Sequence, residues 1–174
     1  PHPAEVFDSA SSLKGITEII KEEFPKLPSN VTIINPEYKI NTYMLFDYID
    51  LGLVFNGTLG LEMSLQGINV ISTGKTPYDG LSITTEPQSI NYYKKLLFGE
   101  NPPLIINKNN LELFSYFYFI KTLIPFNLTE SAYADEFNGF AFKEISNLMP
   151  GNNAYLDHLC KSIIDSKNIV IEDW

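Results

Sequence analysis

The chain has 174 residues, of which 44% are hydrophobic and 19% charged, and this length and composition suit one compact domain with a buried core. Its formal net charge is −9 and its few cations are scattered, which argues against a nucleic-acid-binding surface of clustered Lys and Arg. The single Cys160 excludes an internal disulfide framework and a cysteine-based metal cluster, and it favours a reducing compartment.

The first expected elements are a helix, a short strand and a second helix. Residues 9–24 carry apolar side chains at helical spacing, with a serine available as N-cap, and prolines end the pattern; the apolar positions are Leu13, Ile16, Ile20 and Phe24. Residues 31–36, "VTIINP", are β-branched and closed by Asn-Pro, which predicts a buried strand. A second helix is expected over Thr42–Tyr48.

Residues 51–74 have the pattern of a strand, a helix and a strand. "LGLVFNG" predicts a strand, and "TLGLEMSLQG" predicts a helix that turns Leu61, Met63 and Leu65 inward and ends at Gly67 in the left-handed conformation. "INVISTG" predicts the next strand. Strands that alternate with helices indicate βαβ units and a parallel sheet with right-handed crossovers, hence a Rossmann-like α/β fold in three layers.

The second half of the chain is predicted to be mainly helical. Four segments have helical patterns, namely residues 89–99, 110–126, 138–149 and 153–166. We expect these helices to cover the sheet and to bury most of their aromatic residues, namely Phe114, Phe117, Phe119, Phe140 and Phe142. The expected organisation is a single domain over 1–174, itself a fragment of a larger two-domain protein, with a βαβ donor-binding core over 1–85 and a mainly helical remainder over 86–174. The longest apolar run is interrupted before it could span a bilayer, so we expect a soluble protein.

The turn "NGTLG" between the first predicted strand of this unit and its helix is the first candidate site. In a parallel sheet, ligands bind beyond the carboxyl ends of the strands. Gly57 and Gly60 would let the backbone approach a ligand, Thr58 could cap the helix and offer a hydroxyl, and the first N–H groups of the helix favour an anion. The pattern suits a phosphate, but the same glycines could equally serve tight turns and strand–helix packing alone.

Two further groups of residues could reach the same place. Glu62, in the first helical turn, would repel a phosphate and suits a ribose diol, or it is simply solvated. The loop "STGKTPYDG" offers Gly74 for a sharp exit from the strand, with Lys75 and Tyr78 as possible contacts, although a lone lysine is usually solvated.

The two histidines differ in context. His2 stands between prolines, whose stiff backbone could aim its ring at an anion, but a terminal histidine can also be flexible. His158 falls on an amphipathic helical pattern and suits a surface or packing role. No His, Asp and Glu residues have the spacing of a metal site, so neither a metal nor a further cofactor is expected.

"HPAE", followed by "DLGLVFNGTLGLEMSLQGINVISTGKTPYDGLSIT", resembles the C-terminal nucleotide-sugar-binding half of GT-B glycosyltransferases of bacterial capsule and surface polysaccharide synthesis. The resemblance covers residues 1–84 and is strongest over 50–80. It implies half of a GT-B fold, with His2 and the turn of Gly57, Thr58 and Gly60 at the donor phosphate or nucleotide, and Glu62 at the position of the family's glutamate. "NGT" stands where two hydroxyl residues are common, so one phosphate-contacting hydroxyl is absent.

The resemblance also implies what the chain would work with. The donor would be a nucleotide sugar and the acceptor a growing glycan, and the general base would be an acidic residue of an N-terminal domain upstream of Pro1. The isolated chain is therefore expected to bind a nucleotide weakly and not to turn over. We expect a cytoplasmic location, at the inner face of the membrane; the acidic net charge disfavours direct binding to an anionic surface but allows peripheral contact through partners. Two alternatives stay open: a glycerophosphotransferase of teichoic-acid type and a non-catalytic Rossmann-like binding module.

Overall fold

A computed structural model describes residues 14–38, 40–124, 128 and 139–167. His2 therefore lies outside the described residues. The chain separates into two compact units, Pro1–Ile49 and Asp50–Trp174, and each is described here by itself. The division falls within the range 1–85 that the sequence pattern treats as one βαβ core, and the expected single-domain organisation stays a prediction.

The first unit contains helix α1 (Ile16–Glu23) and a 3-10 helix, η3 (Thr42–Tyr48). The helix expected over 9–24 begins later than predicted, since Lys14 and Gly15 lie outside it. Lys14 instead pairs with Glu22 across two turns, with Nζ and Oε1 2.6 Å apart. The range of η3 confirms the predicted second helix, in its tighter 3-10 form.

The strand predicted over 31–36 is wrong. Residues 31–35 belong to no strand or helix, and both Val31 and Ile34 are exposed in this unit. A β-branched run becomes a strand only where a neighbouring strand completes its hydrogen bonds. Among the described residues of the first unit no strand is present to do so, so the local pattern was not sufficient.

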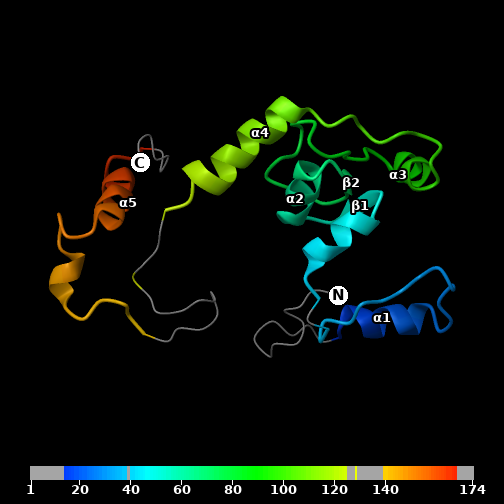
Figure 1. The fold of residues 1–174 in the computed structure, drawn as a ribbon, viewed down its shortest axis with the longest axis horizontal. Helices are drawn as coiled ribbons and strands as arrows, with labels where there is room; N and C mark the ends of the chain where they lie inside the picture. Colours follow the sequence, from blue (N-terminus) through cyan, green and yellow to red (C-terminus); the bar gives the residue numbers. More distant parts are fainter. Residues whose placement is uncertain (1–13, 39, 125–127, 129–138, 168–174) are drawn as a thin grey trace. The chain divides into compact units, whose positions relative to one another are not determined.

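The second unit is built on a βαβ arrangement, shown in Figure 1. Strand β1 (Leu51–Val54) leads into helix α2 (Leu59–Leu65), and strand β2 (Asn69–Ser72) follows. The two strands are parallel, with Leu51 opposite Asn69 and Val54 opposite Ser72. Ile71 also forms a parallel bridge to Thr85. Both strands, the helix between them and the parallel sense of the pairing confirm the prediction, and the fold of this unit is α/β.

The end of α2 confirms the predicted role of Gly67. Its φ of +82° is left-handed, and its N–H donates to Ser64 O at 3.0 Å while the N–H of Ile68 donates to Met63 O at 3.1 Å. This pair of bonds closes a helix in the Schellman motif. The chain can therefore reverse directly into β2.

The inward face of α2 differs from the prediction at one position. Leu61 and Met63 are buried, but Leu65 is 44% exposed, so its predicted inward position is wrong. Leu65 is the last residue of a short helix, where the chain turns away, and it lines a surface hollow. Ser64 takes a buried position instead, and its hydroxyl donates to Gly60 O at 2.9 Å.

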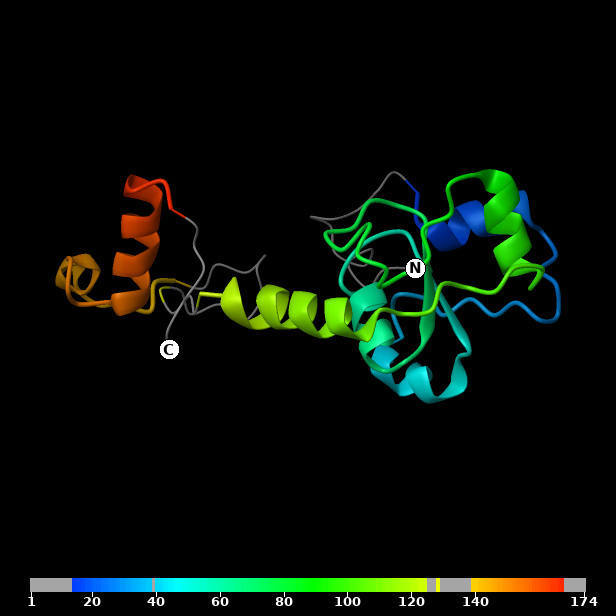
Figure 2. The ribbon, with the colours of Figure 1, turned by 90° about the horizontal axis from the view of Figure 1, so that it is seen from above.

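Three of the four predicted helical segments form α-helices: α3 (Ile90–Leu97), α4 (Lys108–Tyr116) and α5 (Ala154–Ile164). Each begins at a side-chain cap, because Ser89, Asn107 and Asn153 accept a hydrogen bond from the backbone N–H three residues later. Helix α4 continues into a π-helical turn, η4 (Phe117–Lys121). Figure 2 shows α4, in yellow-green, beginning beside α2 and running away from the strands.

The helix predicted over 138–149 is wrong. The described part of this range contains only a short 3-10 helix, η5 (Ile145–Leu148). Gly139 has a φ of +132°, which no right-handed helix accommodates. Asn147 also folds back so that its Oδ1 accepts from the Glu144 N–H at 3.3 Å. This side-chain hydrogen bond caps a single helical turn at Glu144, which disfavours continuation of the helix through that residue.

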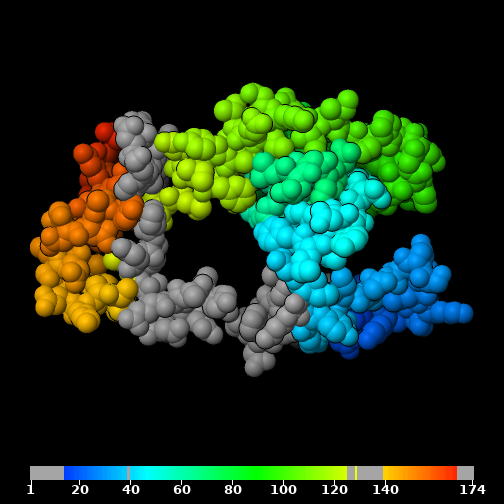
Figure 3. All heavy atoms as spheres, in the orientation of Figure 1, coloured from blue at the N-terminus to red at the C-terminus, as the bar shows by residue number. Residues whose placement is uncertain are grey.

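The core of the second unit forms where α2, α4 and the segment after β2 meet. One cluster of this core consists of the buried residues Leu61, Tyr78, Ile83 and Leu111. Phe114 and Phe119 pack against them as predicted, whereas Phe117 and Phe140 are exposed, which contradicts their predicted core positions, and Phe142 is half-buried. The atoms of residues 50–124 form one continuous mass, coloured cyan to yellow-green in Figure 3. Among the described residues, no helix is both long and apolar enough to cross a bilayer.

Candidate functional site

The predicted site lies where β1 and β2 end at the same edge of the sheet. Residues 55–58 leave β1, and residues 73–80 leave β2. Gly57 is exposed and has a φ of +93°, so only glycine adopts this turn readily. Gly57 therefore forms a solvent-exposed turn directly before α2.

Tyr78 joins the two loops. Its hydroxyl donates to Gly57 O at 2.8 Å, although the two residues stand 21 positions apart. The side chain is only 1% exposed, and its ring meets Phe114 edge-on at 6.1 Å between centroids. The structure thus places the predicted second-loop contact in the core, where its polar end holds the glycine turn.

The same surroundings raise the pKa of Tyr78. Burial is the largest cause, and the nearby carboxylates of Asp79 and Glu62 raise the pKa further. Hydrogen bonds from the Thr76 side chain and the Leu61 backbone act in the opposite direction and lower it. The hydroxyl therefore stays protonated at neutral pH and serves as a donor.

Gly60 and Gly74 are required by packing. A Cβ on Gly60 would lie 2.5 Å from the hydroxyl oxygen of Tyr78, and a Cβ on Gly74 would collide with the carbonyl oxygen of Phe55. The close approach at Gly60 is between a helix and the tyrosine, and that at Gly74 is between the two loop backbones. These contacts explain both glycines without a ligand.

Thr58 occupies the N-cap position of α2, but its side chain makes no capping hydrogen bond there. The predicted side-chain cap is therefore wrong, and its hydroxyl is not committed to the helix. The residue is half-buried, and its backbone carbonyl accepts the Glu62 N–H at 3.0 Å. Glu62 itself is half-buried in the first turn, and Lys75 is exposed in the second loop.

The structure thus brings Gly57, Gly60 and Tyr78 into one contact, and it sets Gly74 against Phe55. Sequence reasoning did not single out Phe55, which is 71% exposed at this edge. No sequence signal could have found it, because the run "LGLVF" does not alternate polar with apolar residues, and the exposure of Leu51, Leu53 and Phe55 is evident only in the structure.

No protein-family model, curated protein or solved structure matches this chain. The resemblance to the GT-B donor half therefore rests on the quoted residues alone and stays a prediction.

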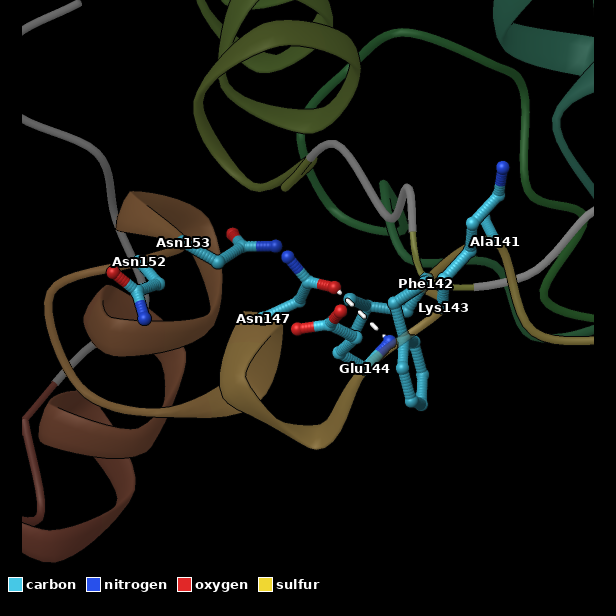
Figure 4. A pocket seen from close by; sticks show the side chains of 8 residues that line it. Ala141, Phe142, Lys143, Glu144, Asn147, Asn152 and Asn153 are labelled. Carbon is cyan, nitrogen blue, oxygen red and sulfur yellow. Dashed lines mark hydrogen bonds between the residues drawn. The ribbon is translucent and has the colours of Figure 1, made fainter.

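Two surface hollows among the described residues lie away from this edge. One, of about 530 Å³, appears in Figure 4, and its lining residues are Leu128, Ala141, Phe142, Lys143, Glu144, Asn147, Asn152 and Asn153. Its amides serve the local backbone: Asn147 accepts from the Glu144 N–H, Asn152 donates to Ser146 O at 2.7 Å, and Asn153 caps α5. A larger hollow of about 720 Å³ includes Asn69, at the opposite end of β2 from the predicted site. Neither of these two hollows is lined by a predicted site residue.

The metal-ligating residue types do not gather in the described part of the chain, where no group of three or more His, Cys, Asp or Glu side chains could hold a metal ion. His158 is half-buried on α5, and within the described residues its Nε2 has no hydrogen-bond partner. This is the packing position expected from its helical pattern. Cys160, on the same helix, is exposed.

Proposed function

We propose that this chain is the Rossmann-like donor-binding half of a GT-B glycosyltransferase, and that a nucleotide sugar binds at the edge formed by residues 55–58 and 73–80. One observation carries the proposal. The loops that leave the carboxyl ends of two parallel strands are tied together by the hydrogen bond from Tyr78 to Gly57. Parallel α/β sheets bind their ligands at this end, and a joined pair of loops is a preorganised surface for one.

The side chains of this edge suit the parts of a nucleotide sugar. Thr58 offers a hydroxyl, Lys75 an exposed cation, and the open turn at Gly57 backbone N–H groups, all of which favour a phosphate. Glu62 suits a ribose diol. Such groups would stabilise the negative charge that develops on the leaving nucleotide. Because the whole chain carries a net charge of −9, a local cation is needed to hold an anionic donor.

The first experiment tests nucleotide binding by the full chain. CMP, CDP, UDP and GDP are each added, and thermal unfolding and calorimetric titration are measured. A ligand at 100 times its dissociation constant adds about 2.7 kcal/mol to the free energy of unfolding. Lys75→Ala should weaken binding several-fold, because the ammonium group would contact phosphate in part through water. Lys94→Ala removes an equally exposed cation from α3 and should leave binding unchanged.

A second experiment separates binding from turnover. The chain alone should bind a nucleotide sugar without transferring its sugar, because the expected general base belongs to another domain. Robust transfer by the purified chain would contradict that assignment. Preferential binding of CDP-glycerol over all nucleotide sugars would instead favour the glycerophosphotransferase of teichoic-acid type.

A non-catalytic Rossmann-like module is the second candidate, and the packing of the glycines favours it. Gly60 and Gly74 are both explained by contacts within the protein, to Tyr78 and to Phe55. If no nucleotide shifts the unfolding temperature or gives heat on titration, the glycine turn is structural and this second candidate replaces the first.

A further inference from the structure

We propose that Phe55 is the surface on which the nucleobase of the donor stacks. This inference rests on the proposed function, and it adds the residue that would contact one part of the ligand, its planar aromatic base. Phe55 directly follows the last residue of β1, and 71% of its surface is exposed. It therefore stands at the carboxyl edge of the sheet, beside the loops that would hold the phosphates.

The second loop lies against one side of Phe55. A Cβ on Gly74 would lie 3.2 Å from the ring carbon Cδ2 of Phe55 and would collide with its carbonyl oxygen, so the backbone of Gly74 lies directly against this residue. The preceding backbone is also fixed, because both the N–H and the hydroxyl of Thr73 donate to Val54 O, at 3.0 and 3.2 Å. One side of Phe55 is thus packed, and the rest faces solvent.

The neighbours of the ring complement a nucleotide. A nucleobase has apolar faces and a polar edge, and it is joined through ribose to anionic phosphates. Phe55 offers an apolar face, and both loops continue from it into polar groups: Asn56 and the open turn at Gly57 on one side, Lys75 on the other. Stacking on an aromatic side chain is tolerant of base identity, so it would supply affinity more than base selectivity.

A different explanation of the exposed ring must be separated from this one. Leu53 is 51% exposed on the same face of β1, so Phe55 could belong to an apolar face that another protein surface covers. Leu53→Ala is therefore the matched control, because it reduces the same apolar face one step further from the predicted site.

The test compares four nucleotides with inorganic pyrophosphate. CMP, CDP, UDP, GDP and pyrophosphate are titrated calorimetrically into the wild-type chain and into Phe55→Leu, which keeps an apolar side chain against Gly74 but has no aromatic face. Phe55→Trp restores an aromatic face, and Leu53→Ala is the control. Circular dichroism of each variant checks that it is folded.

The expected result is a loss of about tenfold in nucleotide affinity for Phe55→Leu, with affinity restored in Phe55→Trp. Pyrophosphate affinity should be the same in all variants, and Leu53→Ala should bind nucleotides like the wild type. Wild-type nucleotide affinity in Phe55→Leu would overturn the stacking role while leaving the donor site in place. An equal loss in Leu53→Ala, or a loss of pyrophosphate affinity in Phe55→Leu, would also overturn it. If the wild-type chain binds none of the nucleotides, the donor site and the stacking role fall together.

Discussion

Adding a methyl group at Gly60 should disturb the tyrosine that joins the two loops. In Gly60→Ala the new Cβ would lie 2.5 Å from the hydroxyl oxygen of Tyr78, well inside van der Waals contact. The tyrosine cannot move away freely, because its ring is buried and its hydroxyl is bonded to Gly57. Overpacking of this kind costs about 1 to 3 kcal/mol, and the better helix propensity of alanine offsets up to about 1 kcal/mol. The expected net loss is about 1 to 2 kcal/mol.

The mechanism can be tested by removing the atom that the methyl group meets. Tyr78→Phe alone should cost about 1 kcal/mol for the lost hydrogen bond to the carbonyl of Gly57, an exposed residue. In the double variant Gly60→Ala/Tyr78→Phe the clash with the hydroxyl is absent. Its loss of unfolding free energy should therefore be smaller, by about 1 kcal/mol, than the sum of the losses in the two single variants. A contact of 3.1 Å with Val54 Cγ2 remains in both backgrounds and does not affect the difference.

The assay is equilibrium unfolding in guanidinium chloride, followed by far-ultraviolet circular dichroism for the wild type, both single variants and the double variant. Gly67→Ala is the control, because a Cβ there has no atom within 4 Å and the change acts only through its left-handed φ of +82°. Its effect should add to that of Tyr78→Phe. If Gly60→Ala and Tyr78→Phe are also additive within about 0.3 kcal/mol, the close contact with the hydroxyl does not limit stability and the reasoning is refuted.

Three further outcomes follow from named contacts. Burial raises the pKa of Tyr78 in the folded state, so folding favours the protonated hydroxyl. The contribution of this hydroxyl to stability is complete below the unfolded pKa of 10.0 and is lost as the pH rises beyond that value. In melts at increasing pH, Tyr78→Phe should therefore lose stability less steeply than the control Tyr48→Phe, a change at an 84% exposed residue. Gly74→Ala should cost about 2 kcal/mol or more in denaturant unfolding, because the backbone carbonyl of Phe55 cannot rotate away as a side chain can; a loss below 0.5 kcal/mol would contradict the close approach. Asn107→Ala should cost about 1 kcal/mol and reduce helical ellipticity, since α4 loses the side chain that caps it, and unchanged unfolding would show that the cap is dispensable.

The βαβ arrangement was predictable because its signals are local. Gly67 marks the end of α2, and the β-branched and apolar residues on either side mark the two strands, so the elements could be placed from adjacent residues. The strand over 31–36 failed for the complementary reason. Its residues have the right propensity, but a strand exists only when another backbone pairs with it, and the sequence of the segment does not specify that partner.

The position of the candidate site was predictable from the sequence, but the contacts that its residues make were not. The sequence placed Gly57, Thr58 and Gly60 at a strand end, as the structure does. It did not reveal that Tyr78 is buried, because a tyrosine in a loop rich in polar residues has no periodic pattern that would place it in the core. The contact between Tyr78 and Gly57 depends on how two loops fold back across the sheet edge, which is a tertiary property.

The bond between Tyr78 and Gly57 also has a consequence for motion. Two loops that share a hydrogen bond and a core ring cannot open independently, because freeing either one breaks the bond and exposes the ring. Their backbone amides should therefore exchange with deuterium through the same opening event, at rates that rise together in Tyr78→Phe. A molecule that binds to one loop would slow exchange in the other without contacting it.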